Sequence, residues 1–303
     1  MPVYAKGKER IQADLLMFLA AVVWGGGFVA QRVATQYLGY FAYNGIRFLL
    51  AGLVLLPIGI RNLKKFDRSL LWILPAGVLL FGGSALQQAG LKTTSAGSAG
   101  FITGVYVVLV PLFLALFWRE KISIVNWLAA FAAVGGTYLL STGGKTMSLS
   151  SGDILELLGA VVWAFHVIVV GLAVRQLDIY VFSVGQFLFC GLVSLAFNQL
   201  SGPLVWSEIH SGLWAILYGG IFSVALGFTL QGIGLSKAPA ADAVLILSLE
   251  SVFAAIFGAL ILFERMNWIQ IIGCAIIMAA ILGVQIYSLH RANQLEVNLE
   301  ANN

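Results

Sequence analysis

The sequence predicts an all-α integral membrane protein with ten transmembrane helices arranged as two inverted five-helix repeats. The 303 residues are 60% hydrophobic and only 10% charged, and the mean hydropathy is +0.95. Soluble domains are about 45–50% apolar and about 25% charged. Ten apolar runs are long enough to cross a bilayer, and the two halves of the chain repeat each other. This composition excludes soluble enzymes, nucleic-acid-binding proteins and secreted disulfide scaffolds.

A membrane-spanning helix needs about 20 predominantly apolar residues. The runs that meet this requirement are 12–31, 41–60, 70–90, 96–118, 123–141, 153–174, 179–199, 212–233, 240–263 and 268–288. Most connections between them are short and contain turn-forming residues, such as Gly143-Gly144. The first run is too long for the apolar core of a signal peptide, so we expect it to remain as a helix. Residues 289–303 are polar and predict a disordered tail.

The repeat is visible without gaps. Residues 14–53 match residues 153–192 at 13 of 40 positions, and residues 87–121 match residues 231–265 at 11 of 35. The matches include Asp, Trp, Gln and Glu, which apolar composition alone does not place in register. We therefore divide the chain into a first five-helix repeat (1–141), a linker (142–152), a second repeat (153–288) and a polar tail (289–303).

An odd number of spans in each repeat means that the second copy enters the membrane from the opposite side. Inverted repeats of this kind have a pseudo-two-fold axis in the membrane plane and a site near the midplane. Exchanging the conformations of the two halves then turns an inward-open state into an outward-open one. This architecture favours a transporter.

Basic residues predict the orientation, because cytoplasmic loops are enriched in Lys and Arg. With both termini in the cytoplasm, twelve basic residues lie inside and four outside. The inner set is Lys6, Lys8, Arg10, Arg61, Lys64, Lys65, Arg68, Arg119, Lys121, Arg175, Lys237 and Arg291, and the outer set is Arg32, Lys92, Lys145 and Arg265. The scatter of these charges gives no nucleic-acid surface, so the predicted partners are lipid and a small-molecule substrate. The oligomeric state is left open.

Four ionisable residues within the spans stand out, since charges inside a membrane usually face a cavity or a partner. Glu156, one turn into the sixth span, is read as an interfacial residue near the positive helix N-terminus. The other three are candidates for function. Arg47 offers a bidentate donor for a substrate carboxylate, or it is a structural or snorkelling arginine. Glu250 either couples transport to protons, binds a substrate ammonium group, or bonds a neighbouring helix. His166 suits a proton-linked switch, although a lone helical histidine is more often a satisfied core residue. We name Glu250 and His166 as proton-coupling candidates.

Aromatic and amide residues complete the predicted substrate-binding set. Trp24 and Trp163 occupy equivalent positions in the two repeats, and with Tyr106 they suit the wall of an aromatic cavity, or plain packing. Asn44, Gln87 and Gln186 are candidates for polar lining. Cys190 and Cys274 lie in apolar runs and are read as packing residues. No spacing typical of a metal site or cofactor motif is present, so we predict neither.

Several short motifs make the chain resemble the EamA-type ten-helix members of the drug/metabolite transporter superfamily. They are Trp24-Gly-Gly-Gly-Phe28, Arg47-Phe48, Gly97-Ser-Ala-Gly-Phe-Ile102, Pro111, Leu249-Glu250, Arg119-Glu120-Lys121 and Glu264-Arg265. The resemblance covers nearly the whole chain. It departs at Ser251, where the family often has proline, and this departure predicts a straighter ninth helix.

The resemblance implies a cavity lined by helices 1–4 and 6–9, with helices 5 and 10 peripheral. It also implies the bacterial inner membrane and export of amino acids or other small metabolites. Together with the residues above, it predicts a secondary exporter of small amphipathic metabolites such as amino acids, with proton coupling as an option. A passive facilitator fits the same sequence. The alternative from another class is an integral membrane enzyme acting on a lipid or prenyl substrate. Such an enzyme would need paired acidic residues to hold a metal, and the acidic residues of this sequence are dispersed.

Overall fold

The computed structural model describes residues 7–64, 68–94, 96–145, 150–261, 263 and 265–301. Within these residues the chain is helical, without strands, and ten helical segments are long and apolar enough to cross a membrane. They coincide with the ten predicted spans to within a few residues at each end. The predicted motif residue Glu264 and the charges Lys6 and Lys65 lie outside the described residues.

Spans 1–5 form the first repeat. They are α1 (Gly7–Ala34), α2 (Tyr40–Asn62), η1 with α3 (Arg68–Trp72 and Ile73–Gly90), α4 with α5 (Ala96–Gly104 and Tyr106–Phe117) and α6 (Ile124–Thr142). Spans 6–10 form the second. They are α7 (Ser151–Ala173), α8 (Ile179–Asn198), α10–η2–α11 (Leu213–Leu217, Tyr218–Phe228 and Thr229–Lys237), α12 with α13 (Ala240–Leu247 and Leu249–Ile261) and α14 (Trp268–Ala301). The short helix α9 (Trp206–Ser211) precedes span 8.

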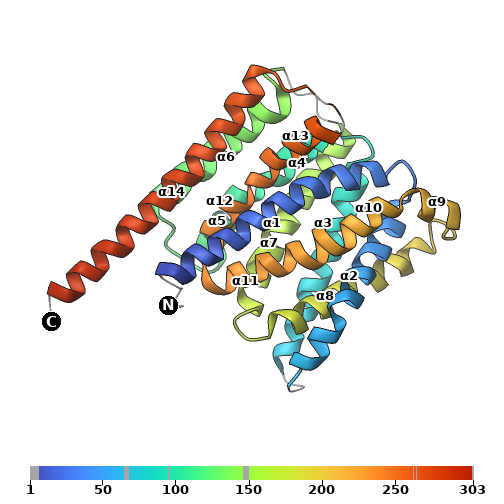
Figure 1. Cartoon of the computed structure of the whole chain (residues 1–303), viewed down its shortest axis with the longest axis horizontal. Helices are drawn as coiled ribbons and strands as arrows, with labels where there is room; N and C mark the ends of the chain where they lie inside the picture. The colour runs from blue at the N-terminus through green and yellow to red at the C-terminus, as the bar shows by residue number, and fades with distance from the viewer. Residues whose placement is uncertain are drawn as a thin grey trace.

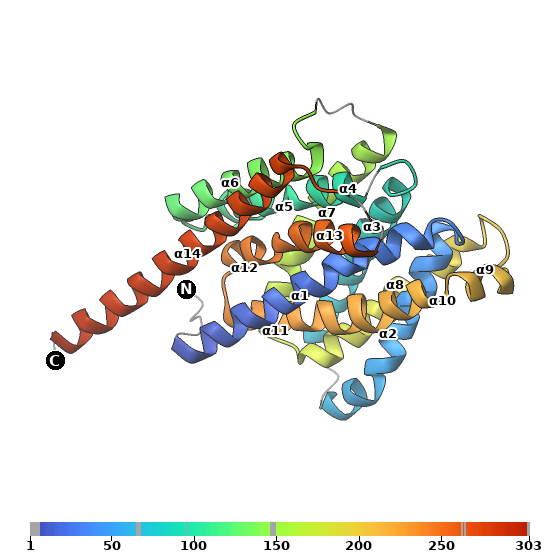
Figure 2. The same cartoon turned by 45° about the horizontal axis from the view of Figure 1, so that its top comes forward.

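Helix pairing follows the predicted pseudo-symmetry. The second and seventh spans pack against each other (α2 with α8) along one edge, and the fifth and tenth (α6 with α14) pack along the opposite edge. Between these pairs, α3 packs on α7 as span 8 packs on α1, and α4 and α5 pack on α7 as α12 and α13 pack on α1. Each contact made by one repeat is therefore repeated by the other. The start of α1 and the end of α14 lie at the same end of the bundle (Figures 1 and 2).

The glycine run Gly25-Gly26-Gly27 lies within an unbroken α1. A side chain at Gly25 would collide with the backbone of Phe253 and Ala254 on α13. The run therefore allows close approach of two helices, as small residues do in membrane bundles.

Three spans are interrupted near their centres. Span 4 breaks at Val105, between α4 and α5. Span 9 breaks at Ser248 between α12 and α13, where the Ser248 hydroxyl bonds the Leu245 carbonyl oxygen at 2.6 Å. A serine that bonds its own helix backbone can disturb a helix without a proline. The straightness expected of the ninth helix stays a prediction. In span 8, η2 is a π-helix of 11 residues. Such segments are rare and often occur at functional sites.

The tenth span continues as helix to Ala301, beyond the candidate membrane segment Trp268–Tyr287. We expected residues 289–303 to form a disordered tail, and the described part of this segment is helical instead. The stretch from Leu289 to Ala301 contains Leu, Ala, Glu and Gln and neither Gly nor Pro, so its helix propensity outweighs its polarity.

Candidate functional site

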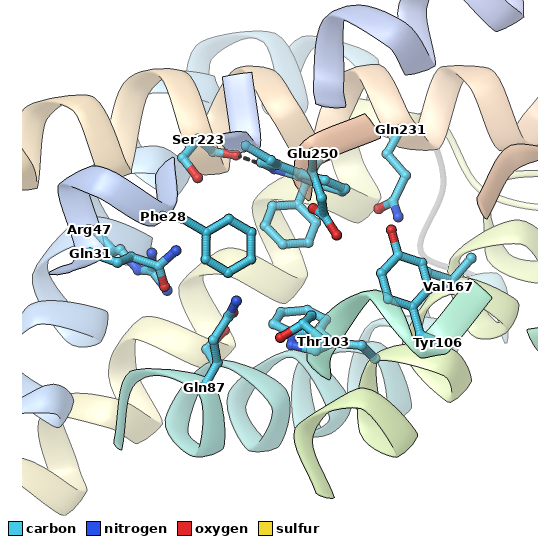
Figure 3. Close-up of a pocket in the computed structure, with 14 residues that line it drawn as sticks. Phe28, Gln31, Arg47, Gln87, Thr103, Tyr106, Val167, Ser223, Gln231 and Glu250 are labelled. Atoms are coloured by element: carbon cyan, nitrogen blue, oxygen red, sulfur yellow. Dashed lines mark hydrogen bonds between the residues drawn. The ribbon is translucent and has the colours of Figure 1, made fainter. Parts of the chain in front are cut away.

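A cavity lies between the two repeats (Figure 3). Seven of the ten spans contribute side chains, and the fifth, seventh and tenth spans contribute none. The lining residues are Trp24, Phe28, Gln31, Arg47, Ser84, Gln87, Thr103, Tyr106, Trp163, Val167, Ser223, Phe228, Gln231 and Glu250.

Most of this lining consists of residues at equivalent positions in the two repeats. The spacing that aligns the first and sixth spans is 139 residues, and the spacing that aligns the third and fourth spans with the eighth and ninth is 144. Five pairs with these spacings line the cavity, namely Trp24 with Trp163, Phe28 with Val167, Ser84 with Phe228, Gln87 with Gln231, and Tyr106 with Glu250. The cavity therefore sits on the pseudo-two-fold axis, where inverted repeats place their sites.

One end of the cavity is cationic. Arg47 on α2 is only 3% exposed, and Gln31 on α1 lies beside it (Figure 3). The Arg47 guanidinium carbon lies 4.8 Å from the ring centre of Tyr43 and 5.0 Å from that of Phe48. The ion pairs among the described residues join Arg10 to Asp14 and Asp242, and none includes Arg47. A buried guanidinium thus faces the cavity without a carboxylate partner.

The middle of the cavity is aromatic. The Trp24 indole N–H donates to the backbone oxygen of Ser223 in the π-helix at 2.9 Å. The Phe228 ring centre lies 4.9 Å from Trp24 and 5.9 Å from Trp163. Phe28 projects into the same space (Figure 3). These rings suit the apolar part of a ligand, as aromatic side chains do in ligand pockets.

The other end is acidic and polar. Glu250 on α13 is 4% exposed, and its Oε1 has no hydrogen-bond partner within the described chain. Tyr106 lines the same part of the cavity, and its hydroxyl also has no hydrogen-bond partner within the described chain. Gln231 projects into the cavity beside them (Figure 3). The arrangement offers acceptors and donors to a cationic or protonated group.

Six of the predicted binding residues line this cavity: Trp24, Arg47, Gln87, Tyr106, Trp163 and Glu250. Asn44, His166 and Gln186 do not. The Asn44 amide donates to the Ser84 backbone oxygen at 2.9 Å, and His166 Nε2 shares a hydrogen bond with Gln186 Oε1 at 3.0 Å. The His166 ring packs edge-on against Trp163 and Phe228, so it lies behind the aromatic wall.

Several residues that line the cavity were not predicted from the sequence. Phe28 and Gln31 lie one and two helical turns after Trp24, so helical periodicity could have found them. The repeat spacing applied to Phe28 gives Val167. Ser223 carries no such signal, because its contribution depends on the π-helix.

The cavity does not present a metal-binding set. Within the described residues no three His, Cys, Asp or Glu side chains converge. The polar groups are one guanidinium, amides, hydroxyls and one carboxyl, which suit an organic ligand with a hydrogen-bonding end.

The family model for EamA-like transporters matches residues 11–142 and 150–286, once for each repeat. The chain belongs to the EamA-like transporter family. This confirms the resemblance to the drug/metabolite transporter superfamily. The protein is accordingly a multi-pass integral membrane transporter for a small molecule, and its family is one of transporters rather than enzymes.

Two of the relatives that match most of the chain are named as transporters. An uncharacterized transporter of Archaeoglobus fulgidus is 29% identical over 283 residues, covering 93% of this chain and 88% of the relative. The uncharacterized transporter YyaM of Bacillus subtilis is 26% identical over 83% of this chain and 87% of its own. A WAT1-related chloroplastic protein of Arabidopsis thaliana is 25% identical over 85% of this chain and 66% of its own. A crystal structure at 21% identity has the same fold, with a TM-score of 0.77 over 94% of this chain and 98% of the other.

Proposed function

We propose that the protein exports a small zwitterionic, amphipathic metabolite, with amino acids as the substrate class, by alternating access between its two repeats. The observation that carries this proposal is the distribution of charge along the cavity. Arg47 lies at one end and Glu250 at the other, with aromatic rings between them, and neither has an ion-pair partner within the described residues.

A buried charge without a partner is expensive, and several kcal/mol are recovered when an opposite charge and hydrogen bonds satisfy it. Arg47 therefore favours a ligand carboxylate, which it can grip with two parallel N–H donors. The unbonded Oε1 of neighbouring Gln31 adds an acceptor for a ligand donor. The aromatic middle then accommodates an apolar side chain.

Glu250 supplies the complementary site for the ligand ammonium group. When the cavity is empty, the same carboxyl binds a proton, so that substrate and proton compete for one acceptor. This competition is the simplest form of coupling that the cavity allows. We assign no proton-coupling role to His166, because it lies behind Trp163 and bonds Gln186.

Different contacts hold the helices together at the two ends of the cavity, and we propose that these contacts restrict access to it. Where α1 begins, Arg10 bonds Asp242 of α12 at 3.0 Å, and Asn126 of α6 also bonds Asp242. Near the end of α1, Arg32 donates to the backbone oxygen of Leu91 after α3. Loosening one set while keeping the other would open the cavity to one side at a time. We place the Arg10 end in the cytoplasm of a bacterial inner-membrane protein, on the excess of basic residues at that end.

Flux from proteoliposomes tests the proposal. Vesicles are preloaded with a labelled panel of amino acids and small metabolites, and efflux is compared for wild type, Arg47→Gln and Arg61→Gln. Gln is the residue at the equivalent position 186 of the other repeat, so that Arg47→Gln is expected to fold, and Arg61 is an exposed arginine on the same helix. We expect saturable efflux of substrates with a carboxylate, weakened selectively in Arg47→Gln. Equal efflux in all three would refute the carboxylate site.

A pH gradient separates coupled from passive transport. Efflux is measured with and without the gradient in wild type, Glu250→Gln and the exposed control Glu208→Gln. Gradient-driven efflux that is lost only in Glu250→Gln supports exchange of substrate for a proton. Efflux that ignores the gradient in wild type would make the protein a passive facilitator and overturn coupling.

A further inference from the structure

A second buried carboxyl lies outside the cavity. Glu156 on α7 is fully buried, and its Oε1 packs against Gly90 at the end of α3, where a side chain would meet this oxygen at 2.8 Å. The proposed transport cycle uses Arg47 and Glu250 and leaves Glu156 without a role. A carboxyl in such a position is costly unless it is paired or protonated.

The hydrogen bonds around Glu156 leave it half satisfied. Its Oε2 accepts the Thr103 hydroxyl of α4 at 3.0 Å, and its Oε1 has no hydrogen-bond partner within the described chain. Both carboxyl oxygens of Asp153, three residues earlier, accept hydrogen bonds. It accepts the Thr94 hydroxyl at 2.9 Å and the Ser150 backbone N–H at 2.7 Å.

No cation faces Glu156 from the described helices packed on α7. Of the charged groups near it, Asp153 on the same helix is negative. Arg32 of α1 donates to the backbone oxygens of Leu91 and Thr94, and within the described residues it forms no ion pair with a carboxylate. From α3 the neighbour is Gly90, and from α4 it is the Thr103 hydroxyl. Two carboxylates one helical turn apart thus share a buried region, and a bound proton on Glu156 removes their repulsion.

Thr103 connects this carboxyl to the cavity. The residue lines the cavity (Figure 3), while its hydroxyl donates to Glu156 Oε2. A hydroxyl has one donor and two acceptor positions, so it can accept a proton on one side while passing its own to the other. Glu156 is therefore one hydroxyl away from the space that holds the substrate.

The other repeat indicates that packing does not require a carboxyl here. The position equivalent to Glu156 is Met17, which packs against Gly234 as Glu156 packs against Gly90. The position equivalent to Thr103 is Leu247. The equivalent contact between the repeats, from span 1 to spans 8 and 9, is thus made by apolar side chains, and the polar pair occurs only where span 6 meets spans 3 and 4.

We propose that Glu156 is a second proton-binding site of the transporter, exchanging its proton with the cavity through the Thr103 hydroxyl. On loading, a hydronium ion in the cavity donates a proton to Thr103 Oγ1 and becomes water, while the hydroxyl proton of Thr103 moves to Glu156 Oε2. On release the same two transfers run in reverse. The role in transport rests on the proposed function, whereas the proton site itself does not.

Infrared titration of the purified protein in lipid nanodiscs, without substrate, tests the site. The carbonyl stretch of a protonated carboxylic acid is recorded against pH for wild type, Glu156→Gln and Glu250→Gln. We expect a band that disappears reversibly at high pH, is lost in Glu156→Gln and persists in Glu250→Gln. A band at position 156 that never titrates would mean a permanently neutral structural carboxyl and would overturn the proposal. Absence of any such band in wild type would overturn it equally.

Three further measurements test the interpretation. Thr103→Val should keep the band and slow its exchange in deuterated water, and unchanged exchange would refute the route through the hydroxyl. Replacing potassium with sodium at constant pH should leave the band in place, whereas a loss driven by sodium would assign the site to a metal cation instead. Glu156→Met, which copies the residue of the first repeat, should retain the fold and lack the band. Since no substrate is used, a failed flux assay leaves this result intact.

Discussion

Single side chains show how far two equivalent positions have diverged. Trp24 and Trp163 both line the cavity, but only the Trp24 indole has a hydrogen bond in the described chain, to the Ser223 backbone oxygen. That oxygen belongs to the π-helix, so Trp24 supports an element that the first repeat lacks. The two tryptophans therefore form a matched pair for mutation.

Trp24→Phe should destabilise the protein more than Trp163→Phe. Both changes remove part of a ring, but only the first breaks a hydrogen bond, which contributes about 0.5–1.5 kcal/mol. Thermal unfolding in detergent measures the difference. Equal shifts in the unfolding temperature would mean that the bond to Ser223 does not stabilise the π-helix.

His166 and Gln186 should behave as one structural unit. Replacing His166 with Leu leaves the Gln186 amide buried without a partner, at a cost of about 1–3 kcal/mol. The double replacement with Leu removes both polar groups and should cost less than the sum of the single changes. Thermal unfolding of the three variants gives this coupling. Loss of pH-dependent flux in the folded double variant would return His166 to a proton-coupling role.

The limits of sequence reasoning are clear from these residues. Arg47 and Glu250 could be predicted because an ionisable residue within an apolar run must face a cavity or a partner. His166 and Asn44 satisfy the same criterion and point to partners instead, Gln186 and the Ser84 backbone. Which of the two outcomes holds depends on the rotation of each helix about its axis. Glu156, two turns before the cavity residue Trp163, was read as an interfacial residue, although the structure buries it completely.

Some features of the helices could be predicted from the sequence and others could not. The ten spans could be predicted because length and apolarity alone define them. The break at Ser248 and the π-helix of span 8 could not, since both arise from backbone hydrogen bonds that depend on neighbouring helices. The corresponding stretch of α3 is an ordinary α-helix, although its sequence aligns with η2.

The contact between α1 and α13 predicts a strong size limit at Gly25. Gly25→Ala should destabilise the bundle by about 1–3 kcal/mol, because the added methyl meets the backbone of Phe253 and Ala254. Gly135→Ala in α6 is the control, since nothing lies within 4 Å of the added carbon there. That change should be neutral or stabilising, as helix propensity predicts. Thermal unfolding and the yield of folded protein measure both. Similar stability for the two variants would contradict the close approach.

The whole molecule is nearly symmetric in shape and asymmetric in chemistry. The two repeats contribute equivalent walls to one cavity. However, the position equivalent to Arg47 is Gln186, and the position equivalent to Tyr106 is Glu250. Symmetry provides two related conformations, as inverted repeats do. The asymmetry gives the cavity a cationic end and an acidic end, and the contacts at the two ends differ.

The closure at the start of α1 should control access to the cavity. Arg10 bonds Asp14 on its own helix at 2.9 Å and Asp242 on α12 at 3.0 Å, so only the second bond joins the two repeats. Both bonds are partly exposed, and each is worth at most about 1 kcal/mol, or about a fivefold change in an equilibrium. Asp242→Asn should therefore favour the state open at this end, whereas Asp14→Asn should change it little.

A cysteine at position 231, near this end of the cavity, and one at position 87, near the other end, report the two states. In Asp242→Asn, labelling of Gln231→Cys by a membrane-impermeant thiol reagent should rise and labelling of Gln87→Cys should fall. Cys190 and Cys274 are replaced by alanine in the background, since they are the free cysteines of the chain. Adding the reagent to right-side-out or to inverted vesicles also reveals which face carries the α1 end. If Asp14→Asn has the same effect as Asp242→Asn, then the loss of negative charge is responsible, and the bond between the repeats does not hold the cavity closed.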